Sequence, residues 1–133
     1  MTNSIIDYIA NYVNEKLIDD EIDFKFKVDT GNFSTHSITM RITSNRDDYM
    51  FLNKNNHSNI QISFIIKDVD QVAIFNIQDT IKDILYDIRF KNLEQYTIYQ
   101  VKNTHTNITS LMEDDTYIGT IDFYIEYIDK QIH

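Results

Sequence analysis

The chain has 133 residues, a net charge of −9, two glycines and no cysteine, proline or tryptophan. This length suits one domain with its own core, and the missing cysteines exclude disulfide scaffolds, zinc fingers and thiol catalysis. The acidic balance argues against a protein that wraps nucleic acid, and the distant glycines Gly31 and Gly119 exclude a Walker loop and a dinucleotide-binding fingerprint.

The first part of the chain predicts a helix followed by a β-hairpin. Apolar residues recur at helical spacing over 4–17, and Ser4 is a suitable N-cap. Apolar and polar residues then alternate over 22–28 and again over 37–43, as in half-buried strands. Turn-forming residues around Gly31 join these two runs, so we expect an antiparallel hairpin.

A long polar loop is expected at about 44–59. This stretch exceeds an ordinary connection, so we expect it to order on contact with a partner. An apolar island at 49–52 either packs back on the core as a flap or docks on that partner. Candidate partner-interface residues come from this loop and from a later acidic loop: Arg46, Asp47, Asp48, Tyr49, Met50, Phe51, Leu52, Asn55, His57, Glu113, Asp114 and Asp115.

The second half of the chain predicts one long helix among strands. Strands are expected at 60–67, 95–102 and 117–128, with a further short strand around Ile108. A helix is expected over 70–88, with Asp70 as its N-cap and an isoleucine stripe along one side.

The order of these elements favours an α+β fold. We expect two helices packed on one face of a mixed or antiparallel sheet of about four to six strands. No linker, repeat or low-complexity segment divides the sequence, so residues 1–133 are expected to form a single domain. No apolar run is long enough to span a membrane, and the N-terminus lacks the pattern of a signal peptide, so a soluble product is expected.

A search for chemistry finds no catalytic, cofactor-binding or metal-ligating residues. No serine lies in a nucleophile motif, so we expect a protein that is not an enzyme and needs no cofactor. An acidic ridge opposite the isoleucine stripe is expected to be a solvated face or half of a charged interface; it consists of Asp79, Asp83 and Asp87. The histidines lack metal-ligand spacing and are expected to be ordinary surface residues: His36, His57, His105 and His133.

A pattern of short segments, mostly patterned hydrophobic residues, runs through residues 37–128. The segments are Arg41, Asp48-Tyr49, Ile60-Gln61-Ile62, Lys67-Asp68, the helix of Ile77, Ile81 and Leu85, Tyr117-Ile118-Gly119 and Phe123-Tyr124-Ile125. This pattern resembles the tail-terminator family of long-tailed, siphovirus-type bacteriophages, whose members are often called minor capsid proteins. The abundance of isoleucine and asparagine, typical of AT-rich genomes, suits a phage of a low-GC host.

The resemblance implies a virion structural protein of the neck, at the head–tail junction, made in the cytoplasm of a host bacterium. Such a protein forms a ring, commonly a hexamer, that caps the finished tail tube. Its partners would be itself, the tail tube protein and the head connector or stopper protein, with no membrane involved. DNA would only pass through the lumen. An acidic lumen surface would repel the DNA and keep it from binding there.

A second interpretation remains open. The chain could be an acidic phage or mobile-element protein that binds and inhibits a host nucleic-acid-binding protein by mimicking nucleic acid. Clustering of the acidic residues on one face would favour this function, whereas the 12 Lys and Arg residues mixed among them weaken it. An enzyme without a visible motif is the third possibility.

Overall fold

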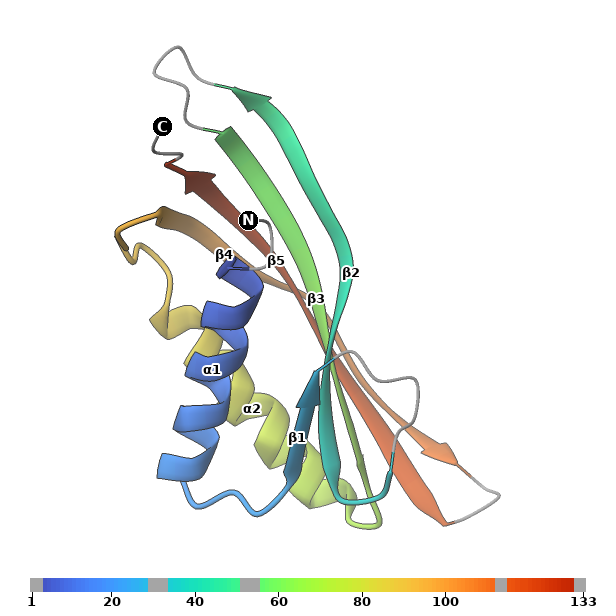
Figure 1. The fold of residues 1–133 in the computed structure, drawn as a ribbon. Coiled ribbons are helices and arrows are strands. Elements are labelled where there is room, and N and C mark those ends of the chain that lie inside the picture. Colours follow the sequence, from blue (N-terminus) through green and yellow to red (C-terminus); the bar gives the residue numbers. More distant parts are fainter. Residues whose placement is uncertain (1–3, 29–33, 51–55, 112–114, 131–133) are drawn as a thin grey trace.

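The computed structural model describes residues 4–28, 34–50, 56–111 and 115–130. Its elements, in chain order, are α1 (Ser4–Asp19), β1 (Lys25–Val28), β2 (Ser37–Met50), β3 (Asn56–Asp68), α2 (Gln71–Asp87), β4 (Tyr96–Leu111) and β5 (Thr116–Asp129). The strands form one sheet in the order β1-β2-β3-β5-β4, and both helices pack on the same face of it (Figure 1). The predicted α+β class, with two helices on one face of a mixed sheet, is confirmed.

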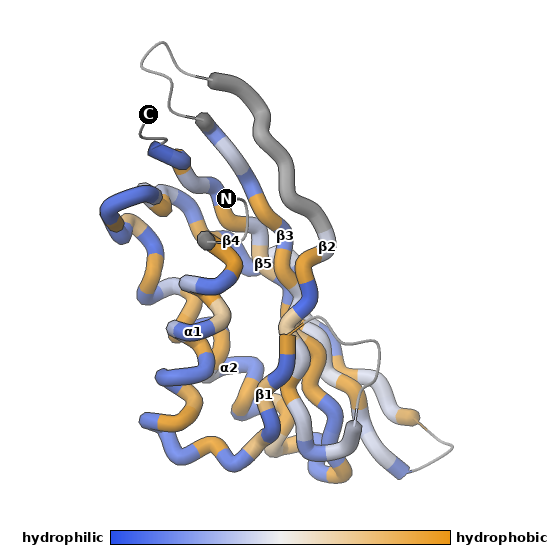
Figure 2. The backbone as a smooth tube through the Cα atoms, in the orientation of Figure 1, coloured by the Kyte–Doolittle hydropathy of each residue, from blue (hydrophilic) through white to orange (hydrophobic). Residues whose placement is uncertain are grey.

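The core lies between the helices and this face of the sheet. Apolar and polar residues alternate along the elements (Figure 2), and the apolar ones meet in a single buried cluster. At its centre the rings of Phe64 on β3 and Phe123 on β5 pack edge to face, with centroids 6.0 Å apart. The predicted isoleucine stripe of α2 is buried here, from Ile74 to Ile88.

The first two strands do not form the predicted antiparallel hairpin. β1 pairs with β2 in parallel, from Lys25 opposite Ser37 to Val28 opposite Met40. The chain therefore returns to the start of β1 before β2 begins, and the Lys25 N–H donates to the His36 carbonyl at 3.2 Å. Alternating polarity determines which face a strand buries but not the direction in which it pairs, so the sequence pattern could not reveal this.

The predicted polar loop at 44–59 is also wrong for its described residues. β2 continues to Met50 and β3 begins at Asn56, and the two strands pair along this length; residues 51–55 lie outside the described part. This end of the sheet extends past the helices (Figure 1), so neither face needs a regular apolar row. Bulges at 42–44 and 47–49 further disturb the period of two that identifies a strand.

The second helix and the last strands follow the prediction with small changes. Asp70 caps α2 as predicted, because its Oδ1 accepts from the Val72 N–H at 3.0 Å. The predicted strands at 95–102 and around Ile108 are one strand, β4, interrupted by bulges at 98–100 and 103–105. β5 lies between β4 and β3 and pairs antiparallel with both.

Candidate interaction site

The described members of the predicted partner interface lie toward opposite ends of the sheet. Arg46 to Met50 form the last part of β2, while Asp115 precedes β5 at the far end. The β3–β5 register runs for thirteen residue pairs between these ends, which corresponds to about 40 Å. Phe51, Leu52, Asn55, Glu113 and Asp114 lie outside the described residues. The structure therefore does not bring the two predicted groups together.

Asp115 borders a small surface hollow. The hollow has a volume of about 290 Å³ and is lined by Val69, Ser110, Leu111, Asp115 and Tyr117. Asp115 is exposed and has a backbone φ of 56°, in the left-handed region that residues other than glycine seldom adopt. Among the described residues that line the hollow, Asp115 is the only one with a carboxylate, and its exposed side chain suits a surface contact.

His57 is not the ordinary surface residue that the sequence predicts. It is only 7% exposed, and its Nε2 lies 3.1 Å from Glu126 Oε2 on β5. Tyr99 on β4 donates its hydroxyl to the same oxygen at 3.0 Å, and its ring centroid lies 5.3 Å from that of His57. The three side chains link three neighbouring strands, β3, β5 and β4, near the end of the sheet that extends past the helices. Burial follows from this partnership, which a single sequence does not reveal.

The other histidines have different surroundings. The ring of His36 stacks on Phe24 with centroids 3.9 Å apart, and its Nδ1 lies 3.2 Å from Asp68 Oδ1. His105 is exposed, as predicted, and His133 lies outside the described residues. Across the parts of the chain that the structure describes, no His, Asp and Glu side chains gather into a group that could hold a metal ion.

The two layers of the molecule carry opposite charge. The helices α1 and α2 contain six carboxylates (Asp7, Glu15, Asp19, Asp79, Asp83 and Asp87) and two lysines (Lys16 and Lys82), and all six carboxylate residues are exposed. We call the side of the sheet away from the helices the open face. Side chains alternate along a strand, and Ile60, Ile62, Phe64 and Ile66 of β3 are buried toward the helices. The strand register therefore identifies which residues of each strand lie on the open face. Basic residues on the open face are Lys25, Lys27, Arg41, Lys67 and Lys102.

Carboxylates are few among the described residues of the open face. Asp122 accepts from the Ser63 hydroxyl at 2.5 Å, and Glu126 contacts His57 and Tyr99 as described above. Among the described residues of the two layers, the helix layer is therefore acidic and the open face is basic. The predicted acidic ridge is present on the exposed side of α2.

One residue of the acidic ridge also connects the two helices. The Tyr12 hydroxyl on α1 donates to Asp87 Oδ2 on α2 at 2.6 Å. This hydrogen bond, with burial and the charge of Asp87, raises the pKa of Tyr12 to about 12. Burial, followed by the charge of Asp87, also raises the pKa of the neighbouring Tyr8. The contact holds the phenol in its protonated form and positions α1 against the end of α2.

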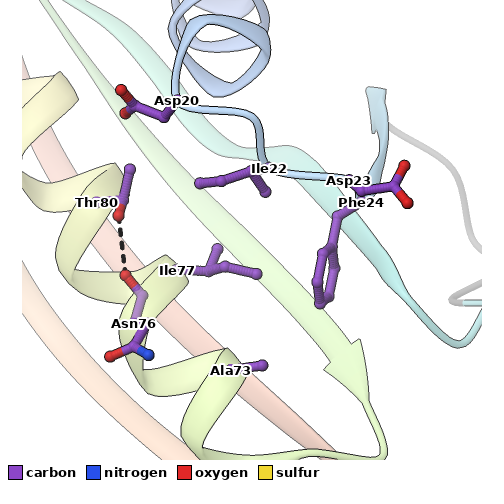
Figure 3. A pocket seen from close by; sticks show the side chains of 8 residues that line it. All are labelled: Asp20, Ile22, Asp23, Phe24, Ala73, Asn76, Ile77 and Thr80. Carbon is purple, nitrogen blue, oxygen red and sulfur yellow. Dashed lines mark hydrogen bonds between the residues drawn. The ribbon is translucent and has the colours of Figure 1, made fainter.

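A larger hollow lies between α2 and the segment that joins α1 to β1. Its volume is about 350 Å³. Figure 3 shows the apolar side chains of Ile22, Phe24 and Ile77 directed toward a common space, while the carboxylate of Asp23 points outward. The Thr80 hydroxyl donates to the backbone carbonyl of Asn76 at 3.0 Å. An apolar floor with acidic residues beside it suits an apolar group that carries positive charge.

An exposed aromatic side chain follows the C-terminal end of α2. Phe90 is 70% exposed and has a φ of 68°, which is a strained backbone for a bulky residue. The guanidinium of Arg89 lies 5.3 Å from the centre of the Phe90 ring and 5.5 Å from that of Tyr86. This turn therefore presents an aromatic ring beside a positive charge.

Sequence reasoning missed both the hollow and the Phe90 turn. Ile22 and Phe24 read as the inner face of a strand, but β1 begins only at Lys25, and they line the hollow instead. Phe90 continues the polar-apolar mixture after α2, and neither its exposure nor its positive φ can be read from residue types. The one available signal was Asp19-Asp20-Glu21, the acidic run directly before this segment.

In the described residues, neither helix combines the length and the apolar character that crossing a membrane requires. No protein-family model matches the chain, and no curated protein matches it. Among solved structures, the chain is similar to a chain of one described as "Virion of native gene transfer agent (GTA) particle". The TM-score is 0.58 and the sequence identity 8%, over 90% of this chain and 93% of that chain. The two chains therefore share a fold over nearly their whole lengths.

Proposed function

We propose that this protein is a structural component of a phage-like virion and acts without catalysis. The observation that carries this proposal is the fold shared with a chain of a gene transfer agent virion, because it covers nine-tenths of both chains. Because the match covers nearly all of both chains, neither chain contains a large insertion, which is consistent with similar subunits of a particle. The exposed features of the surface are charged layers and shallow hollows, which suit contacts between proteins.

We further propose the role of a tail terminator, for which the resemblance of residues 37–128 is the support. In this role, copies form a ring, which we take to be a hexamer, at the head–tail junction. The ring binds the last tail tube subunits on one side and the head connector on the other. The strand ends that extend past the helices at 44–50 and 104–111 are suited to these axial contacts, because they reach beyond the compact part of the domain (Figure 1).

The charge distribution suits a ring through which DNA passes. If the helix layer lines the lumen, exposed carboxylates such as Asp79 and Asp83 face the duplex and repel its phosphates. The basic open face then lies on the outside, away from the DNA path. DNA is thus cargo in transit and not a ligand in this proposal.

Deletion of the gene in a strain that produces the particles tests the terminator role. We expect filled heads and unjoined tails of irregular length, because nothing would stop tube growth or present a docking surface. Electron microscopy of the lysate measures both features. A copy of the wild-type gene supplied in trans should restore joined particles, whereas normal particles from the deletion strain would contradict the role.

The acidic helix layer favours one other function, that of an inhibitor which mimics nucleic acid. Six exposed carboxylates on two adjacent helices could imitate a row of phosphates. This function requires a 1:1 complex with a basic host protein, competed by DNA. Pull-down from host lysate followed by DNA competition distinguishes it, because a virion protein is expected to bind itself and other virion proteins.

A further inference from the structure

The two features that sequence reasoning missed have complementary chemistry. The turn after α2 carries the exposed Phe90 ring with Arg89 stacked beside it and Lys91 directly after it. The hollow offers a floor of Ile22, Phe24, Ala73 and Ile77. Its segment between α1 and β1 carries Asp20, Glu21 and Asp23 and no basic residue. The aromatic group flanked by cations is thus complementary in chemistry to the apolar hollow flanked by carboxylates.

Size and backbone geometry support the same match. A hollow of about 350 Å³ is large enough for a phenyl ring with part of a neighbouring side chain. The backbone of Phe90 has a φ of 68°, which is strained for a bulky residue, at the turn that presents its exposed ring.

The turn and the hollow lie at different places along α2, so one copy cannot join them. Phe90 follows Ile77 by thirteen residues, which corresponds to about 20 Å along a helix. A contact between the turn of one copy and the hollow of another joins two different surfaces. Such heterologous contacts repeat from copy to copy and close into a ring when the rotation permits.

We propose that the Arg89-Phe90 turn of one copy binds the hollow between α2 and the α1–β1 segment of a second copy. The Phe90 ring covers Ile77 and Phe24, and Arg89 and Lys91 lie against Asp20 and Asp23. Successive copies then place their α2 helices head to tail around the ring. This contact deepens the proposed function and rests on it for its role, but it is measured on the purified protein alone.

Sedimentation over a wide concentration range, up to about 1 mM, tests the contact first. We expect the wild type to self-associate and Phe90→Gly to weaken association by about tenfold to a hundredfold, as expected for loss of a buried aromatic ring. Glycine also accepts the positive φ, so thermal melting should show a fold at least as stable. Phe75→Ser is the matched control: Phe75 is 55% exposed on α2 and does not line the hollow.

Mixing two variants then identifies the surfaces. Phe90→Gly keeps its hollow, while Ala73→Arg keeps its turn and fills the hollow with bulk and positive charge. At a concentration where the wild type associates and Phe90→Gly does not, each variant alone should be monomeric, and an equimolar mixture should form a 1:1 heterodimer and nothing larger. Asp23→Lys replaces Ala73→Arg if the latter melts at a lower temperature.

The proposal is overturned if the wild type stays monomeric throughout the range, if Phe75→Ser weakens association as much as Phe90→Gly, or if the mixture remains monomeric. Mass spectrometry of purified particles is independent of all three results. A protein that is present in particles but fails these tests would retain the virion function and lose only this contact.

Discussion

Gly119 lies where α2 crosses β5, and its missing side chain lets the two elements approach. A Cβ atom at this position would clash with Ile74 Cγ2 and would come within 2.8 Å of Gln78 Nε2. Gln78 cannot move freely, because its Nε2 donates to the carbonyls of Asn107 and Thr120 at 2.9 and 3.0 Å. The glycine is therefore needed for packing and not for an unusual backbone angle.

We expect Gly119→Ala to lower the free energy of unfolding by about 1–3 kcal/mol, the usual cost of overpacking a core. Urea denaturation followed by circular dichroism measures the change. Thr109→Ala on the exposed side of β4 is the control, and it should stay within about 0.5 kcal/mol of the wild type. A stable Gly119→Ala variant would show that α2 can shift away from β5.

The hydrogen bond between Tyr12 and Asp87 predicts a pH dependence on the alkaline side. The pKa of Tyr12 is raised from 10.0 to about 12 in the fold, so the protonated phenol stabilises the native state. This contribution is fully present below pH 10 and is lost as the pH rises toward 12. Tyr12→Phe should remove it, so the melting temperatures of variant and wild type should converge above pH 12.

Absorbance of the phenolate provides the direct measurement. The difference in alkaline titration between wild type and Tyr12→Phe should show one tyrosine with a midpoint well above 10. A difference titration centred near 10 would mean that the contact between the two helices does not form in solution.

Among the elements, α2 depends on Asp70, the residue that caps its N-terminal end. Asp70 accepts from the Val72 N–H, and α2 has no acidic residue in its first turn that could replace it. Asp70→Ala should therefore lower the free energy of unfolding by about 1 kcal/mol. Thermal melting tests this against Asp70→Asn, which keeps the cap and should cost less. Equal losses in the two variants would assign the effect to charge instead of capping.

Elements whose apolar residues follow one period over many residues could be predicted from the sequence. The Ile74–Ile88 stripe gave α2 within one residue at each end, and the alternation from Ile121 to Tyr127 gave the centre of β5. The prediction was wrong for the direction in which β1 pairs and for the extent of β2. The alternation of β1 does not encode the direction in which it pairs, and bulges at 42–44 and 47–49 interrupt the period of β2.

The candidate sites were harder to predict than the fold, since they depend on contacts distant in sequence. His57 lies 69 residues from Glu126, and nothing in its own segment indicates burial. Ile22 and Ile77 line one hollow (Figure 3) only because α1 and α2 pack side by side (Figure 1). The acidic ridge was predictable because it follows from helical spacing within one element.

At the scale of the whole molecule, acidic residues lie on the helix layer and basic residues on the open face of the sheet. A subunit with an acidic helix layer and a basic open face has a defined orientation relative to charged neighbours and to DNA. Its turn at Phe90 and its distant hollow give it two unlike ends. Both properties suit a subunit of a closed, polar ring, and neither is needed by a protein that acts as a monomer.

The central claim is that the protein is a structural part of a virion. Quantitative mass spectrometry of density-purified particles, from a strain that carries the gene, tests it most directly. We expect its peptides at a fixed number of copies per particle, constant between preparations and resistant to a salt wash. Absence of the peptides from purified particles, with the protein recovered in the host lysate, would contradict the account.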